Sequence, residues 1–173
     1  YGTTRVTYSR KSSGTAVFKT AENLPADFPS SSLPIYYENR PPTVDMFFDD
    51  MIKLTLFLSV PIFPERNVSR LKDVMVDRGY SNYILKRPDV KKIDLKEGDK
   101  DGGLNSNNTT YETLLQPALI SYILRYIGTD LEIDKCKCLH PLIIEDWLAY
   151  DWEKRTKYDL TIASMYACFG SSK

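Results

Sequence analysis

Two acidic residues lie far apart in the chain, and each stands where an apolar element begins or ends. Glu65 follows Val60-Pro61-Ile62-Phe63-Pro64, an apolar run that predicts a β-strand. Asp159 lies in Lys157-Tyr158-Asp159-Leu160, where the last apolar helix is expected to begin. Strand ends and helix starts hold side chains rigidly, while the adjoining loops leave them accessible to a ligand.

Each acid taken alone has an ordinary interpretation. Glu65 would be a solvated residue paired with Arg66 or Lys72. Asp159 would interact with the helix dipole, as acidic residues in a first helical turn do.

The interpretation changes if the two carboxylates converge. Carboxylates held close together repel each other unless a cation lies between them. Mg²⁺ and Mn²⁺ prefer such oxygen ligands. Two ions about 4 Å apart can activate a water and stabilise the leaving oxygen in phosphodiester cleavage. Glu65 and Asp159 are therefore candidate catalytic residues and candidate ligands of a two-metal site.

Basic residues form two groups near the expected site. Runs of charge are usually solvated faces, but on both sides of a carboxylate cluster they would hold DNA phosphates. The candidate nucleic-acid-binding residues are Lys86, Arg87, Lys154, Arg155 and Lys157.

Other catalytic motifs are weak or missing in the sequence. Cys136-Lys137-Cys138-Leu139-His140, with Cys168 as a fourth ligand, does not have a standard zinc spacing. His140 is the only histidine and no G-x-S-x-G accompanies it, which argues against a Ser-His-Asp hydrolase. No G-x-x-x-x-G-K-[ST] segment occurs, so no ATPase activity is expected of this chain.

Composition sets the broad class. The chain has 173 residues, a formal net charge of zero and 42% apolar residues, as expected for one globular domain. Three cysteines favour a reducing cytosol over a disulfide framework. No apolar run is long enough to span a membrane, and no signal peptide is recognisable. Because the chain opens on Tyr1 without Met, we expect a fragment or a processed piece.

Local patterns predict alternating strands and helices, which is typical of parallel βαβ connections. Thr43 is the expected N-cap of one helix, and Thr109 to Glu112 fits a capping box in front of another that contains Pro117. We expect a long loop over 86–108. The predicted strands are 15–20, 33–37, 60–65, 81–85 and 131–133, and the predicted helices are 44–54, 68–78, 111–126, 141–150 and 158–169.

Three segments resemble the large terminase proteins of tailed phages, notably the crAss-like group. Residues 36–48 resemble the family's Y-x-G-R-P-x-T-V-E-E-F segment, with Asn39 in place of its usual Gly. Glu65-Arg66-Asn67 resembles its E-x-N strand end, and residues 157–163 resemble its D-D-L-x-x-A helix start. The resemblance extends from about Gly14 to Gly170.

The resemblance implies an α/β fold, namely an RNase H-like domain with a mixed central sheet flanked by helices. Such a domain cleaves concatemeric double-stranded DNA during phage genome packaging, in the cytoplasm of the infected bacterial host. Its cofactor would be Mg²⁺ or Mn²⁺, held by a carboxylate triad in which Glu65 is the second acid and Asp159 the last. The first acid lies on the first strand, yet residues 1–14 contain no Asp or Glu. Either that strand precedes Tyr1 or the site is incomplete.

The family implies further partners, and two alternatives stay open. An N-terminal ATPase domain would be missing, and the portal and the small terminase subunit would be partners. The main alternative is a non-catalytic RNase H-like module that docks to portal or motor subunits through the 86–108 loop and aromatic residues. Another is an RNase H-like resolvase or RNase. The enzyme hypothesis requires that Glu65 and Asp159 face each other across a cleft.

Overall fold

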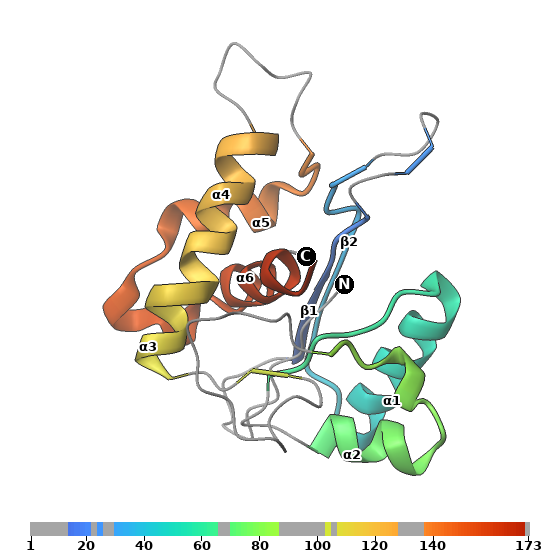
Figure 1. Ribbon diagram of the computed structural model, residues 1–173. Coiled ribbons are helices and arrows are strands. Elements are labelled where there is room, and N and C mark those ends of the chain that lie inside the picture. Colours follow the sequence, from blue (N-terminus) through green and yellow to red (C-terminus); the bar gives the residue numbers. More distant parts are fainter. Residues whose placement is uncertain are drawn as a thin grey trace.

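A β-hairpin lies between two layers of helices in the computed structural model of the protein (Figure 1). The structure describes residues 14–21, 24–25, 30–65, 70–86, 103–104, 107–127 and 137–171. Strands β1 (Gly14–Phe18) and β2 (Ile35–Asn39) are antiparallel, with Ala16 opposite Tyr37. The helices are α1 (Val44–Leu58), α2 (Arg70–Asp77), α3 (Asn108–Thr110), α4 (Gln116–Tyr126), α5 (Pro141–Ala149) and α6 (Asp159–Ser171).

Alternating residues of β1 serve two separate hydrophobic cores. Val17 joins the core around α6, while Ala16 and Phe18 join the core around α1 and α2. This follows from the period of two along a strand, which turns successive side chains to opposite faces. We call these the α6 core and the α1 core. In Figure 1, α6 lies between β1 and α4, and α1 and α2 lie on the other side of the hairpin.

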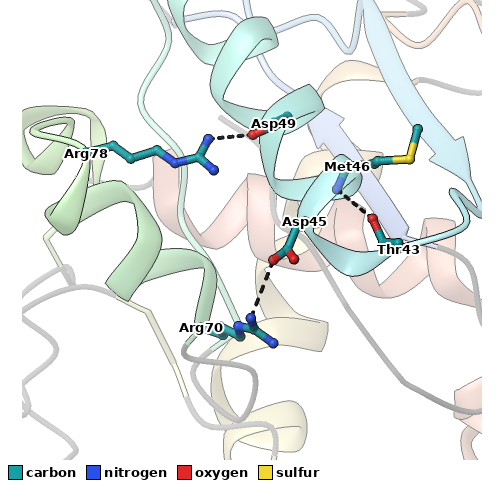
Figure 2. A network of polar contacts seen from close by, with 6 residues as sticks. All are labelled: Thr43, Asp45, Met46, Asp49, Arg70 and Arg78. Carbon is teal, nitrogen blue, oxygen red and sulfur yellow. Dashed lines mark hydrogen bonds and ion pairs between the residues drawn. The ribbon is translucent and has the colours of Figure 1, made fainter.

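Helix α1 begins and packs as its sequence predicts. Thr43 Oγ1 accepts a hydrogen bond from the Met46 backbone N–H at 3.3 Å, which confirms the N-cap. The helix buries one face, formed by Phe47, Phe48, Met51, Ile52 and Thr55. Its outer face forms two ion pairs, Asp45 with Arg70 at the start of α2 and Asp49 with Arg78 just beyond its end (Figure 2).

The start of the α3–α4 segment differs from the prediction. The cap is Asn107, whose Oδ1 accepts a hydrogen bond from the Thr110 backbone N–H at 2.7 Å, and Thr109 already lies inside the helix. A π-helical turn, Tyr111–Leu115, then joins α3 to α4. Pro117 follows it in the first turn of α4. A proline lacks an N–H and its ring clashes with the carbonyl four residues earlier, so a local change of helical hydrogen bonding accommodates it.

Helix α6 is buried on nearly every side. Its residues from Leu160 to Phe169 are all buried, and the helix contacts β1, α4 and α5. Its sequence is apolar or small throughout this run, as expected of a helix without a solvent face. Among its polar residues, Ser164 donates its hydroxyl to the Leu160 carbonyl at 2.7 Å.

The chain is mixed α/β, as predicted, but the sheet in the described residues has two strands and is antiparallel. The predicted strands over 60–65 and 81–85 appear only as isolated bridges. Ile62 pairs in parallel with Ile84 and Glu65 pairs in parallel with Leu104, while Ser81–Tyr83 is a 3₁₀ turn. Pro61 and Pro64 have no N–H to donate, so the first of these segments cannot extend a ladder.

Of the remaining predicted elements, some are confirmed and others lie outside the described residues. The helices over 68–78, 141–150 and 158–169 are confirmed within a few residues as α2, α5 and α6. The predicted strand at 131–133 and most of the 86–108 loop lie outside the described residues. No helix in the described ranges has the length and apolar character that crossing a bilayer requires.

Candidate functional site

Glu65 is a buried carboxylate, only 5% exposed. The interpretation of Glu65 as a solvated strand-end residue is therefore wrong. A buried carboxylate is costly unless hydrogen bonds, a cation or a proton compensate it, and Glu is seldom found fully buried otherwise. Its burial distinguishes Glu65 from a surface charge.

The segment that carries Glu65 runs between the two helical layers. Ile62 belongs to the α1 core, whereas the next residue, Phe63, belongs to the α6 core and contacts the rings of Tyr166 and Phe169. Alternation along an extended segment puts Glu65 on the same side as Phe63. Glu65 is thereby assigned to the side that faces α6.

A second contact joins this segment to α6. Leu104 forms a parallel bridge with Glu65, and its backbone N–H donates to the Pro64 carbonyl at 3.3 Å. The Leu104 carbonyl in turn accepts a hydrogen bond from the Tyr166 hydroxyl at 3.2 Å. Tyr166 lies seven residues beyond Asp159, or about 10 Å along the axis of α6.

Asp159 is half-buried and is the first residue of α6. A neighbouring acid on α5, Asp146, holds the same helix start, because its Oδ2 accepts hydrogen bonds from both the backbone N–H and the hydroxyl of Thr161, each at 2.7 Å. Sequence reasoning missed Asp146, since a cap supplied by another helix leaves no local pattern. Two carboxylates therefore approach the positive end of the α6 dipole.

The two predicted metal ligands, Glu65 and Asp159, carry carboxylate oxygens, which Mg²⁺ and Mn²⁺ prefer as ligands. Within the described ranges there is no group of three His, Cys, Asp or Glu side chains placed to hold a metal ion.

Two of the predicted phosphate-binding residues, Arg155 and Lys154, already interact with other groups of the protein. Arg155 stacks over Trp152 and Tyr111, with centroid distances of 4.7 and 5.1 Å, and donates to Asn108 Oδ1 at 2.7 Å. Lys154 Nζ lies 3.0 Å from Asp151 Oδ2. A hydrogen bond from Lys154 lowers the pKa of Asp151, and the same bond raises the pKa of Lys154.

The other predicted cations are less constrained or lie elsewhere. Lys86 and Lys157 are exposed, and Lys157 stands two residues before Asp159. Arg87 lies outside the described residues. Arg155 thus has a packing role of its own, and Lys157 is the cation best placed to meet a phosphate near Asp159.

The Cys-x-Cys-x-His segment does not gather into a metal centre in the described residues. Cys138 is buried and bridges to Leu33, and His140 Nε2 lies 2.8 Å from the Pro34 carbonyl oxygen. Cys136 lies outside the described residues. The described part of the motif therefore joins the start of α5 to residues 33–34, which lead into β2.

Comparison of the chain with protein-family models, with curated proteins and with solved structures found no match.

Proposed function

We propose that the chain is the nuclease domain of a phage DNA-packaging motor, with an RNase H-like fold. In this proposal it cleaves double-stranded DNA with the help of Mg²⁺ or Mn²⁺. Glu65 and Asp159 are the metal ligands and catalytic residues, and portal and small terminase subunits are partners. The observation that carries the proposal is the burial of the Glu65 side chain, which is 5% exposed.

Features of the fold support this assignment. An antiparallel hairpin is followed by α1, then by an extended segment, by α2 and by a second segment that pairs in parallel with the first at Ile62 and Ile84. A parallel pair joined by a helix is the βαβ connection. In the proposal, this single parallel bridge across α2 is the remnant of one such connection.

The chain's own residues have distinct tasks in this proposal. Bound divalent ions would supply an activated water and stabilise the charge that develops on the leaving oxygen. Glu65, held between the cores, keeps one carboxylate in a dry environment where electrostatic interactions are strong. Asp159 is fixed at the start of a buried helix. Lys157 and Lys86 would hold the flanking phosphates.

The direct test is plasmid nicking in Mn²⁺, in Mg²⁺ and in EDTA. We expect metal-dependent nicking that Glu65→Gln and Asp159→Asn each reduce by about 100-fold or more, because each removes a charged ligand from the site. Asp77→Asn is the matched control, since Asp77 is an exposed acid at the end of α2. It should nick at the parental rate.

Mn²⁺ binding by calorimetry completes the test. The two site variants should lose binding and the control should keep it. Nicking that survives both substitutions would overturn the site. Mn²⁺ binding without any nicking would overturn the nuclease assignment for this chain and favour the docking alternative.

That alternative, a non-catalytic module that docks to portal or motor subunits, is favoured by a different observation. Several large apolar side chains are exposed on the outer helices, among them Leu124 of α4 at 77% and Leu148 of α5 at 83%. Exposed apolar side chains of this kind are typical of protein interfaces. A docking module would bind a partner through these residues and would be indifferent to Glu65→Gln.

A further inference from the structure

A hollow lies between strand β2 and one face of helix α1. Its volume is about 500 Å³, within the range of about 300–1,000 Å³ that is usual for small-molecule sites. One strand residue and four helix residues line it, namely Tyr37, Asp50, Lys53, Leu54 and Phe57. The helix residues are spaced i, i+3, i+4 and i+7, which places them on one face of α1. The hollow is therefore formed by two regular elements.

The lining combines apolar side chains with two charged groups. Tyr37 and Leu54 pack against the α1 core, whereas Phe57 is 84% exposed. An aromatic ring that stands this far out of the core offers a flat apolar face to a ligand. Small-molecule sites have the same composition, mostly apolar and aromatic with a few polar groups that fix the orientation of the ligand.

The Asp50 carboxylate is oriented by a hydrogen bond within the lining. The Tyr37 hydroxyl donates to Asp50 Oδ2 at 2.8 Å. Burial raises the pKa of Tyr37 to about 12, and the bond to Asp50 adds to that rise, so the hydroxyl keeps its proton at neutral pH. A carboxylate has about four acceptor positions, and this bond uses one of them. Asp50 therefore has acceptor positions left for the N–H groups of a ligand.

Lys53 brings a positive charge to the same lining. It is exposed, and its charge contributes to the lowered pKa of Asp49 after the larger effect of the Arg78 hydrogen bond. Asp49 already forms an ion pair with Arg78. The Lys53 ammonium has three donors on a flexible stem, which suits it to an anionic group of a ligand in the hollow.

We infer that this hollow binds a nucleotide, with the base stacked on Phe57, the N–H groups of the base donated to Asp50 and the phosphate at Lys53. Stacking on an aromatic ring accepts any base, because every base has a π-face. Guanine presents two adjacent N–H donors, at N1 and N2, which match the two oxygens of one carboxylate. Guanine is therefore the expected base, and its phosphate gains a charge-assisted hydrogen bond from Lys53.

The hollow and the predicted ligand Asp159 lie in different parts of the molecule. Tyr37 and α1 belong to the α1 core, whereas Asp159 begins α6, on the other side of the hairpin (Figure 1). Each contact in the hollow comes from a side chain of the chain itself, so nucleotide binding needs no divalent ion. The inference therefore does not rest on nuclease activity.

The test is calorimetry of the whole chain in EDTA with guanosine 5′-monophosphate, with guanosine and with adenosine 5′-monophosphate. We expect the guanine nucleotide to bind about tenfold more tightly than either of the others, because guanosine lacks the phosphate and adenine lacks the paired donors. A thymine oligonucleotide with one central guanine, compared with thymine alone, identifies the source of the nucleotide. Binding of the guanine strand that is tighter than binding of the free nucleotide assigns the site to a nucleic-acid strand, and weaker binding assigns it to free nucleotides.

Three variants assign the contacts. Phe57→Ala should weaken binding of the guanine nucleotide about tenfold, as expected for the loss of one stacked ring. Asp50→Asn keeps an acceptor for Tyr37 but should remove the preference for guanine over adenine. Lys53→Met should remove the preference for the nucleotide over guanosine. Ile120→Ala is the matched control for Phe57→Ala, because Ile120 of α4 is a large apolar side chain that is 55% exposed and outside the hollow.

A chain that binds no nucleotide would overturn the inference and would leave Phe57 to an interface with another protein. Binding that Phe57→Ala leaves as tight as in the parent, or that Ile120→Ala weakens equally, would overturn it as well. The variant Glu65→Gln should bind the guanine nucleotide as the parent does, whatever its effect on nicking. This inference and the proposed function can therefore fail separately.

Discussion

The two helical layers are attached to the hairpin in different ways. Helix α6 is buried all round, between β1, α4 and α5, whereas α1 buries one face and exposes the other. The exposed face of α1 reaches α2 through Asp45–Arg70 and Asp49–Arg78 (Figure 2), and Phe57 near its end is 84% exposed. Asp159 therefore begins the helix that the core surrounds on more sides than it surrounds α1.

The two layers should differ most in how much stability is lost when an aromatic side chain is truncated to Ala. Tyr166→Ala empties a fully buried site in α6 and should lower the free energy of unfolding by about 3–5 kcal/mol. Phe57→Ala removes a ring from solvent and should change it by about 0.5 kcal/mol or less. Urea denaturation measures both. Equal effects would show that the layers are packed alike.

Alkaline pH should weaken the α6 core next most strongly. Burial raises the pKa of the Cys168 thiol from 9.0 to about 12. The unfolded chain therefore loses this proton first, and the stability that the neutral thiol contributes is intact below pH 9 and is lost as the pH rises toward 12. Relative to Cys168→Ala, the parent should lose about 1.4 kcal/mol per pH unit in this window. A constant difference between the two would contradict the burial of the thiol.

A smaller effect is expected at the start of α6. Asp146→Ala removes the acceptor of two hydrogen bonds from Thr161 and should lower the free energy of unfolding by about 1 kcal/mol. Asp146→Asn keeps an acceptor oxygen and should retain most of this stability. Chemical denaturation of the three proteins decides whether Asp146 caps the helix.

The smallest effect belongs to the α1–α2 ion pairs. The Arg78 hydrogen bond lowers the pKa of Asp49, but both side chains are exposed, so Asp49→Asn should shift the melting temperature only slightly. The shift should vanish in about 1 M salt, where the Debye length is about 3 Å. A large, salt-independent shift would indicate that the pair orders the layer.

The same contrast explains what the sequence could predict. The helix α1 and its cap at Thr43 follow from local residues and a 3.6-residue period, and both are confirmed. The strands predicted over 60–65 and 81–85 are wrong, because each forms only isolated bridges. Pro61 and Pro64 interrupt the ladder of the first, and the pairing partners come from distant segments. Apolar runs alone do not distinguish a strand from a single bridge.

For the site, sequence reasoning selected Glu65 and Asp159 but not their surroundings. Glu65 is buried where Leu104 pairs with it, and Leu104 is far from it in the chain. Asp146 was missed for the same reason, since a cap supplied by another helix becomes visible only in three dimensions. Lys154 and Arg155 were selected as phosphate ligands, yet both charges have partners within the protein.

The most direct test of the account is a crystal structure determined in the presence of Mn²⁺, with the metal located by its anomalous scattering. The account predicts a peak between the carboxylates of Glu65 and Asp159, within about 2.0–2.5 Å of oxygen atoms of both. A structure in which the two carboxylates point apart, with Mn²⁺ absent or bound elsewhere, would contradict it.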